Sequence, residues 1–129
     1  AKPQLHAITV VLRDEAGRVL FIRHSYGPPG WTLPGGGVIG REDPADAARR
    51  EMREELGLGL DQLTLLETFD ETVSGAPQTA HVFLAQIEAE PQPDGREVIE
   101  ARFFMVEEVP GPISKLTRRR LATLDDPHG

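Results

Sequence analysis

Apolar positions near the start of the chain predict a β-hairpin. Residues 7–12 (AITVVL) and 19–22 (VLFI) are rich in β-branched and aliphatic side chains, a composition that favours strands. Between them lie residues 14–17 (DEAG), a typical turn sequence. We expect this hairpin to supply two strands of a sheet. One of them could form an edge of that sheet.

Residues 25–42 (SYGPPGWTLPGGGVIGRE) hold six glycines and three prolines, a composition that excludes a helix. They predict a loop with a short strand around residues 31–33. A glycine run before a helix is also found in phosphate-binding loops, but no Gly-Lys-Ser/Thr sequence follows here. We therefore interpret the glycines as sites of tight turns that deliver Glu42 and the helix after it.

The next segment has the strongest helix pattern in the sequence. Asp43 is a good N-cap, Pro44 suits the first helical position, and Gly57 is a typical C-terminal stop. These signals predict a helix of about 13 residues and ~20 Å. Its apolar stripe recurs at spacings of three and four residues: Ala45, Ala48, Met52 and Leu56.

The second half of the chain predicts further strands and a terminal helix. Residues 63–73 and 79–88 read as two strands joined by a turn, residues 89–97 as a loop, and residues 101–106 as a short strand. Ile113, Leu116, Leu121 and Leu124 give the terminal helix an apolar stripe. We expect Arg118, Arg119 and Arg120 on its solvated side. The predicted fold is α/β, with both helices covering faces of one mixed sheet.

Three glutamates cluster on the middle helix. At about 100° per residue, Glu55 lies near +40° and Glu54 near −60° of Glu51, beside the apolar stripe and facing outward. Like charges at these spacings repel unless a cation compensates, and magnesium prefers carboxylate oxygens. The alternative is a solvated acidic face, balanced by arginines at positions 49, 50 and 53.

Composition narrows the possible partners. The formal net charge of −7 disfavours long nucleic acid, because phosphate backbones need a basic surface. A small phosphorylated substrate remains compatible, since a bound divalent cation locally reverses the charge of an acidic site. There are no cysteines, which excludes disulfides and thiolate chemistry. No apolar run approaches the ~20 residues that span a bilayer, and no signal-peptide layout is present. We expect one cytoplasmic domain, residues 1–129.

The glycine loop and the helix together resemble the signature of the Nudix family. Gly36 is followed by five residues and Glu42, and seven more lead to residues 50–58 (REMREELGL). Every specified position of the signature is met, with Met52 in an aliphatic position. Random composition would give this match roughly once in a billion starting positions. The resemblance implies a Nudix-type α/β/α sandwich with a mixed central sheet.

The resemblance also implies a divalent metal, usually Mg²⁺, with Mn²⁺ as a substitute. By position in the signature, Glu51 and Glu55 are the best ligand candidates, and Glu54 would bind the same ion or a second one. Glu42 could join through water. The residue before the motif glycine often offers its backbone carbonyl, and here that residue is Gly35.

The implied reaction is hydrolysis of a nucleoside diphosphate linked to a group X, which gives a nucleoside monophosphate and phosphorylated X. Arg50 would orient the glutamates, although a simple surface ion pair is an alternative. The general base would be Glu51, or a later-loop acid such as Glu97 or Glu100. Both later acids could equally be ordinary solvated loop residues.

The substrate contacts are less specified. Arg23 could contact a phosphate or be a surface arginine, and Tyr26 and Trp31 could stack on a base, although Trp31 also suits the core. We interpret His24 and His81 as structural. No subfamily marker names the nucleotide or X. A non-catalytic sensor of a nucleotide metabolite on the same fold is the alternative, and the retained motif glutamates favour the enzyme.

Overall fold

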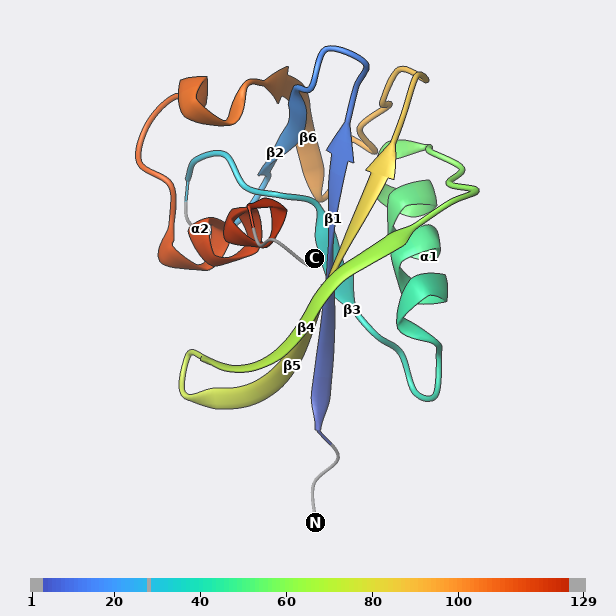
Figure 1. Cartoon of the computed structure of the whole chain (residues 1–129), viewed down its shortest axis with the longest axis vertical. Helices are drawn as coiled ribbons and strands as arrows, with labels where there is room; N and C mark the ends of the chain where they lie inside the picture. The colour runs from blue at the N-terminus through green and yellow to red at the C-terminus, as the bar shows by residue number, and fades with distance from the viewer. Residues whose placement is uncertain (1–3, 28, 126–129) are drawn as a thin grey trace.

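A computed structural model describes residues 4–27 and 29–125, and within them six strands form one mixed sheet (Figure 1). The strands are β1 (Leu5–Arg13), β2 (Val19–His24), β3 (Gly35–Gly37), β4 (Thr64–Val73), β5 (Ala76–Gln86) and β6 (Val98–Phe104). The helices are α1 (Pro44–Leu56) and α2 (Lys115–Leu121), with 3₁₀ turns at Val106–Glu108 and Ala122–Leu124.

The strand order is β4-β5-β1-β2-β6, and β3 pairs with β1 beside this path. β1 lies parallel to β5 and antiparallel to β2 and β3, which makes the sheet mixed. The first hairpin is therefore interior, and the expectation that it supplies an edge strand was wrong. β4 and β6 are the strands at the two ends of this order, because β1 and β2 each pair with a strand on both sides.

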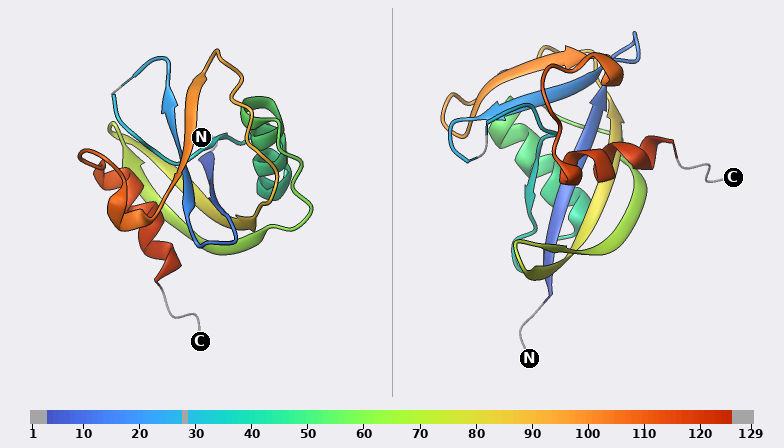
Figure 2. Two further views of the ribbon diagram at one scale, coloured as in Figure 1. Left: turned by 90° about the horizontal axis from the view of Figure 1, so that it is seen from above. Right: turned by 90° about the vertical axis from the view of Figure 1, so that its left-hand side faces the viewer.

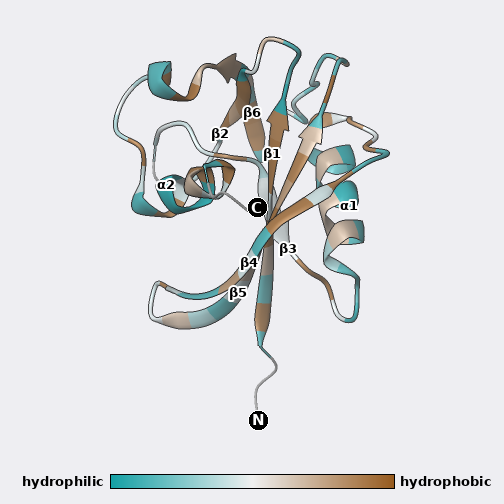
Figure 3. Ribbon diagram, in the orientation of Figure 1, coloured by the Kyte–Doolittle hydropathy of each residue, from teal (hydrophilic) through white to brown (hydrophobic). Residues whose placement is uncertain are grey.

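The helices cover opposite faces of the sheet (Figure 2). Alternate side chains of β1 enter two separate cores: Val10 and Leu12 pack with Met52 of α1, whereas Val11 packs in the cluster that holds Leu121 of α2. The apolar strand segments lie between the helices, and polar residues mark the outer side of α1 (Figure 3). The predicted α/β/α sandwich is confirmed.

The middle helix has the predicted bounds and caps. The side chain of Asp43 accepts a hydrogen bond from the Ala45 backbone N–H at 2.9 Å, and Pro44 occupies the first turn. Gly57 adopts a left-handed φ of 64°, and its N–H donates to Arg53 O. Local signals therefore place α1 firmly, and with it the glutamates that it carries.

The glycine run differs from its prediction as a loop. Gly35–Gly37 form β3, while the strand expected around residues 31–33 reduces to one bridge between Ile22 and Thr32. Glycine permits this close pairing: a Cβ built at Gly35 would lie 2.2 Å from the Ile8 carbonyl oxygen. The backbone of β1 thus occupies the space in which a side chain at position 35 would lie.

One arginine of α2 also differs from its prediction as a solvated residue. Arg120 is 4% exposed rather than solvated, because it donates two hydrogen bonds of 2.6 Å to the Glu71 carboxylate of β4. Arg119 pairs with Glu67, and its guanidinium lies 3.9 Å from the centre of the Phe69 ring. In the part of the chain that the structure describes, no helix has the length and hydropathy needed to cross a membrane.

Candidate active site

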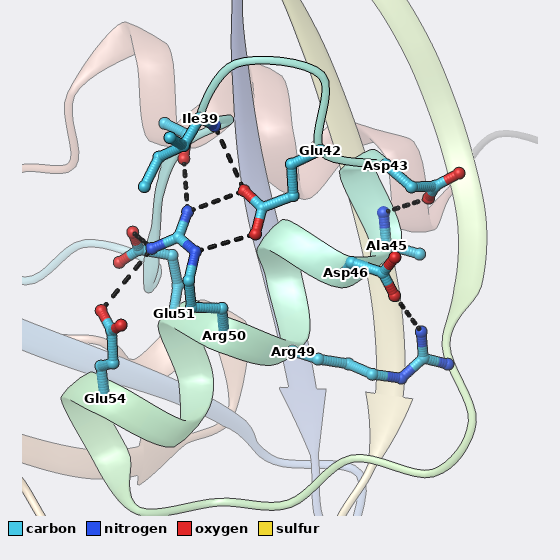
Figure 4. Close-up of polar contacts among 10 residues, drawn as sticks. Ile39, Glu42, Asp43, Ala45, Asp46, Arg49, Arg50, Glu51 and Glu54 are labelled. Atoms are coloured by element: carbon cyan, nitrogen blue, oxygen red, sulfur yellow. Dashed lines mark hydrogen bonds and ion pairs between the residues drawn. The ribbon is translucent and has the colours of Figure 1, made fainter.

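Arg50, in the middle of α1, is at the centre of a polar network that joins the helix to the loop before it (Figure 4). Its Nε and Nη2 donate to the two carboxylate oxygens of Glu42, at 2.9 and 3.0 Å, and Nη2 also reaches Gly37 O at 3.0 Å. Nη1 donates to Glu51 Oε1 at 2.8 Å and lies 3.6 Å from Glu54 Oε2. Arg50 thus links the glycine loop to two helix glutamates, which favours an orienting role over a simple surface pair.

Glu55 is nearly fully buried, at 4% exposure, rather than facing outward beside the apolar stripe. Its Oε2 has no hydrogen-bond partner within the described residues. Burial raises the pKa of Glu55 to about 8, and the negative charges of Glu51, Glu97 and Asp94 add to the rise. A buried carboxyl oxygen without a partner is costly, and a bound cation would remove that cost.

Gly36 makes room for the Glu51 carboxyl. A Cβ built at Gly36 would lie 2.5 Å from Glu51 Cδ and 2.7 Å from both carboxyl oxygens. These distances are far below van der Waals contact, so a larger residue would displace the carboxyl. The first glycine of the signature and its helix glutamate are therefore direct neighbours in space.

The carboxylates of α1 form a compatible donor set for a hard cation. Among the described residues, no three acidic or histidine side chains are already gathered around one point at metal-binding distance. Glu51 and Glu54 instead share the Arg50 guanidinium. Magnesium is often held by only one or two carboxylates, with water and substrate phosphate completing its shell. Glu51 and Glu55, whose Oε2 has no hydrogen-bond partner among the described residues, fit that requirement.

The loop of residues 89–97 lies beside these glutamates. Glu54, Glu55, Asp94, Arg96 and Glu97 line a cleft of about 470 Å³. The Asp94 N–H donates to Glu55 O at 2.9 Å, which ties the loop to α1. Asp94 Oδ1 accepts from the backbone N–H groups of residues 96–98, and the bond from Val98 is the main reason that the pKa of Asp94 is lowered.

Asp94 and Arg96 were not among the residues predicted for the site. The Asp-Gly pair at 94–95 signals a turn, but nothing in its sequence shows that this turn docks on α1. Glu97 does lie in this cleft. Glu100 does not line it: it belongs to β6 and forms ion pairs of 3.2 Å with Arg23 and 3.0 Å with Arg102.

The proposed substrate contacts lie at the end of β2 and beyond it. Arg23, held by Glu100, also lies over the Trp31 ring at 5.5 Å. Trp31 packs edge-on against Phe104 at 5.1 Å, as its alternative interpretation as a core residue expects. Tyr26 is 63% exposed, and its ring centre lies 5.7 Å from that of His24.

A second cleft, of about 260 Å³, lies against the same glycines. Its lining includes Gly35, Gly36, Thr32, Gln78, Thr117 and His24. The wall is mixed: apolar side chains such as Leu33 and Leu116 alternate with hydroxyl, amide, imidazole, guanidinium and backbone groups. The glycine strand therefore lies between the helix carboxylates and a cleft lined by both apolar and hydrogen-bonding groups.

Comparison with known proteins gives a consistent result. The chain is 37% identical over 84 residues to a bis(5′-nucleosyl)-tetraphosphatase (asymmetrical) of Caenorhabditis elegans, covering 60% of this chain and 61% of that protein. It is 42% identical over 52 residues to an RNA pyrophosphohydrolase of Halorhodospira halophila, covering 40% of this chain and 28% of that protein. In both, the match spans less than two thirds of the relative's length.

A solved structure extends the similarity to the whole fold. The MutT NUDIX hydrolase from Burkholderia pseudomallei superposes with a TM-score of 0.83 at 29% identity, covering 95% of this chain and 99% of that one. The model of the NUDIX domain matches residues 3–124. The signature at residues 36–58, the sandwich around it and this match agree: the chain belongs to the NUDIX domain family.

Proposed function

We propose that this chain is a divalent-metal-dependent pyrophosphohydrolase that cleaves a nucleoside diphosphate linked to X into a nucleoside monophosphate and phosphorylated X. Two neighbouring carboxyls carry the proposal: that of Glu51, which lies against Gly36, and that of Glu55, whose buried Oε2 has no hydrogen-bond partner among the described residues. Family relatives are hydrolases of this kind and generally need a divalent metal. The retention of all four motif glutamates argues against a sensor without catalytic activity.

Glu51 and Glu55 would hold Mg²⁺, for which Mn²⁺ could substitute, and Glu54 and the Gly35 carbonyl would be further ligands. When bound, the metal would neutralise diphosphate oxygens and favour formation of the attacking hydroxide. Glu42, whose carboxylate is bound on both oxygens by Arg50, would act by fixing that arginine. Arg50 in turn would hold Glu51 in place.

The reaction would require a base to accept one proton from the attacking water. Water adds to one phosphorus, the bond from that phosphorus to the bridging oxygen breaks, and both products leave as phosphates. Glu97 suits this role because it lines the same cleft as Glu54 and Glu55 while itself being exposed. Glu51 is the second candidate. Glu100 is a poor one, since two arginines hold it in β6.

The proposed substrate is small and nucleotide-like, with its diphosphate at α1 and one attached group in the cleft of about 260 Å³. Tyr26 is exposed, and its ring lies next to His24 of that cleft, so it could stack on a base. Arg23 and Trp31 contact each other and would act more indirectly. We also propose a cytoplasmic location and a homodimer that pairs through an edge strand such as β4.

A phosphate-release screen tests the proposal. Purified protein is incubated with nucleoside triphosphates, nucleotide sugars, ADP-ribose and dinucleoside polyphosphates, with Mg²⁺ or with EDTA. We expect Mg²⁺-dependent hydrolysis of at least one class, and Glu55→Gln should lower turnover by about 10²-fold or more while remaining folded. Equal turnover of wild type and variant, or full activity in EDTA, would refute the proposal.

A further inference from the structure

His24 occupies the junction between the two clefts. It lines the cleft beside Gly35 and Gly36, and its Nδ1 lies 3.3 Å from the backbone oxygen of Glu97, which belongs to the cleft of the helix glutamates. The next residue, Ser25, strengthens this junction: its N–H donates to Glu97 O at 3.0 Å and its hydroxyl to Arg96 O at 2.5 Å. His24 is thus fixed at the point where a substrate that spans both clefts would pass.

An irregularity in the sheet places the imidazole there. Arg23 pairs with Glu100, but His24 pairs with Val98, so Ile99 is an extra residue in β6. Such a bulge bends the strand and redirects the side chains beside it, and bulges are common next to active sites. The irregular pairing of β2 with β6 therefore sets the position of the half-buried His24 ring, which belongs to a strand and not to a loop.

The contact with Glu97 also fixes the tautomer. A carbonyl oxygen only accepts hydrogen bonds, so Nδ1 of His24 must carry the proton and donate it. Nε2 is then the ring nitrogen left for another partner, and no hydrogen bond within the described part of the chain uses it. It can accept a hydrogen bond when the ring is neutral, or donate one to a phosphate oxygen when the ring is charged.

We propose that His24 is a substrate-positioning residue whose Nε2 contacts the diphosphate or the ribose hydroxyl next to it, while Nδ1 holds the Glu97 loop. The inference rests on the proposed function and extends it to a residue outside the signature. It replaces our interpretation of His24 as merely structural. It also links substrate contact to the loop that carries the candidate base, since one ring touches both.

Two amide substitutions separate the roles of the two nitrogens. Asn at position 24 can place a donor where Nδ1 lies but ends short of Nε2, whereas Gln reaches the position of Nε2. We expect His24→Asn to have the same unfolding temperature as wild type. Its kcat/KM for a substrate found in the screen should nevertheless be lower by about tenfold or more. His24→Gln should recover much of that loss.

Nuclear magnetic resonance supplies a test that does not depend on knowing X. ¹⁵N-labelled protein is titrated with Mg²⁺ and methylenediphosphonate, a diphosphate mimic that cannot be hydrolysed. We expect the Nε2 resonance of His24 to shift as the mimic binds, while the Nε2 resonance of His81 stays in place. His81 is a suitable control because its Nε2 is already engaged with His6 at 2.9 Å.

The outcomes separate this inference from the proposed function. Hydrolysis with wild-type kcat/KM in His24→Asn, or binding of the mimic without a shift of His24 Nε2, would overturn the role of His24 and leave the enzyme intact. Equal losses in both variants with a lowered unfolding temperature would show a packing role and also overturn it. Wild-type protein that neither hydrolyses the panel nor binds the mimic would refute the proposed function itself.

Discussion

The contact between Gly36 and Glu51 explains a spacing that sequence alone leaves unexplained. The two residues are 15 positions apart (51 − 36), yet a methyl group on Gly36 would overlap the Glu51 carboxyl at 2.5 Å. The carboxyl is also held by Arg50 on its other side. The position of the Glu51 carboxyl thus depends on the absence of a side chain at Gly36 and on the Arg50 guanidinium beside it.

We predict that Gly36→Ala lowers kcat/KM by about tenfold or more, because a displacement of ~1 Å in an active site can cost as much as ~10²-fold. The matched control is Gly37→Ala, where an added Cβ meets nothing within 4 Å. Steady-state kinetics of both variants measures the effect, with circular dichroism as a check of folding. Equal activity of the two alanine variants would contradict the argument.

The sequence identifies the chemical type of the site residues but not their environments. Glu51, Glu54 and Glu55 are recognised from spacing, and the same spacing suggests that all three face outward. Glu55 is instead buried, and the loop of residues 89–97 docks on the end of α1 beside it, through Asp94 N–H to Glu55 O and Gln92 N–H to Leu56 O. Such contacts join distant segments, so no local pattern contains them.

The elements differ in how far local signals determine them. α1 could be predicted to the residue because its caps and its apolar spacing lie within one continuous segment. β3 could not, since glycine has no strand preference and its pairing depends on the backbone of β1. A terminal helix forms as predicted, but Ile113 precedes it and Leu116 of its expected apolar stripe is exposed. The burial of Arg120 on this helix depends on Glu71, 49 residues earlier.

The Arg120–Glu71 pair should be an important tie between α2 and β4. Both side chains are largely buried, at 5% and 12% exposure, and Gln78 donates a further bond of 2.6 Å to Glu71. We predict that Glu71→Gln destabilises the protein by about 3–5 kcal/mol at pH 7, because removing one partner leaves a buried charge unpaired. Urea unfolding measures this, with the exposed Arg118→Gln as control, expected within about 0.5 kcal/mol of wild type.

The same pair gives a pH dependence with a definite sign. The Arg120 guanidinium lowers the pKa of Glu71 below its ordinary value of 4.5. The stabilisation is therefore fully present above the unfolded pKa and is lost as the pH falls through the lower, folded one. Wild type and Glu71→Gln should thus converge in stability only in strong acid. A constant difference between them down to that range would contradict this origin.

At the scale of the molecule, the sequence indicates the layers but not the order of the strands. Two amphipathic helices and apolar strands require a sheet covered on both faces. The parallel pairing of β1 with β5 joins segments about 70 residues apart, and β2 pairs with β6 across a similar separation. Turn sequences predict which adjacent strands pair in a hairpin. The pairings between distant strands depend instead on how the two hydrophobic cores pack.

The chain carries a formal charge of −7, and in the described part of it a buried oxygen of Glu55 has no hydrogen-bond partner, so the stability of the protein should depend on pH and on cations. The pKa of Glu55 is about 8, raised by burial and by Glu51, against an ordinary value of 4.5. Below pH 4.5 the group is neutral in both the folded and the unfolded state. As the pH rises above 4.5, the unfolded state releases its proton first, so the folded state loses stability progressively until the pH has passed 8.

We therefore predict that, without divalent metal, Glu55→Gln melts about 3–9 °C above wild type at pH 9, because it removes a buried charge, and close to wild type at pH 4. Calorimetry in EDTA measures this, with the exposed Glu54→Gln as control. Adding Mg²⁺ should raise the wild-type melting temperature, since the ion binds the folded state, and should raise that of Glu55→Gln far less. If both proteins gain equally from Mg²⁺ at matched ionic strength, the ion acts by screening charge and Glu55 does not help to hold it.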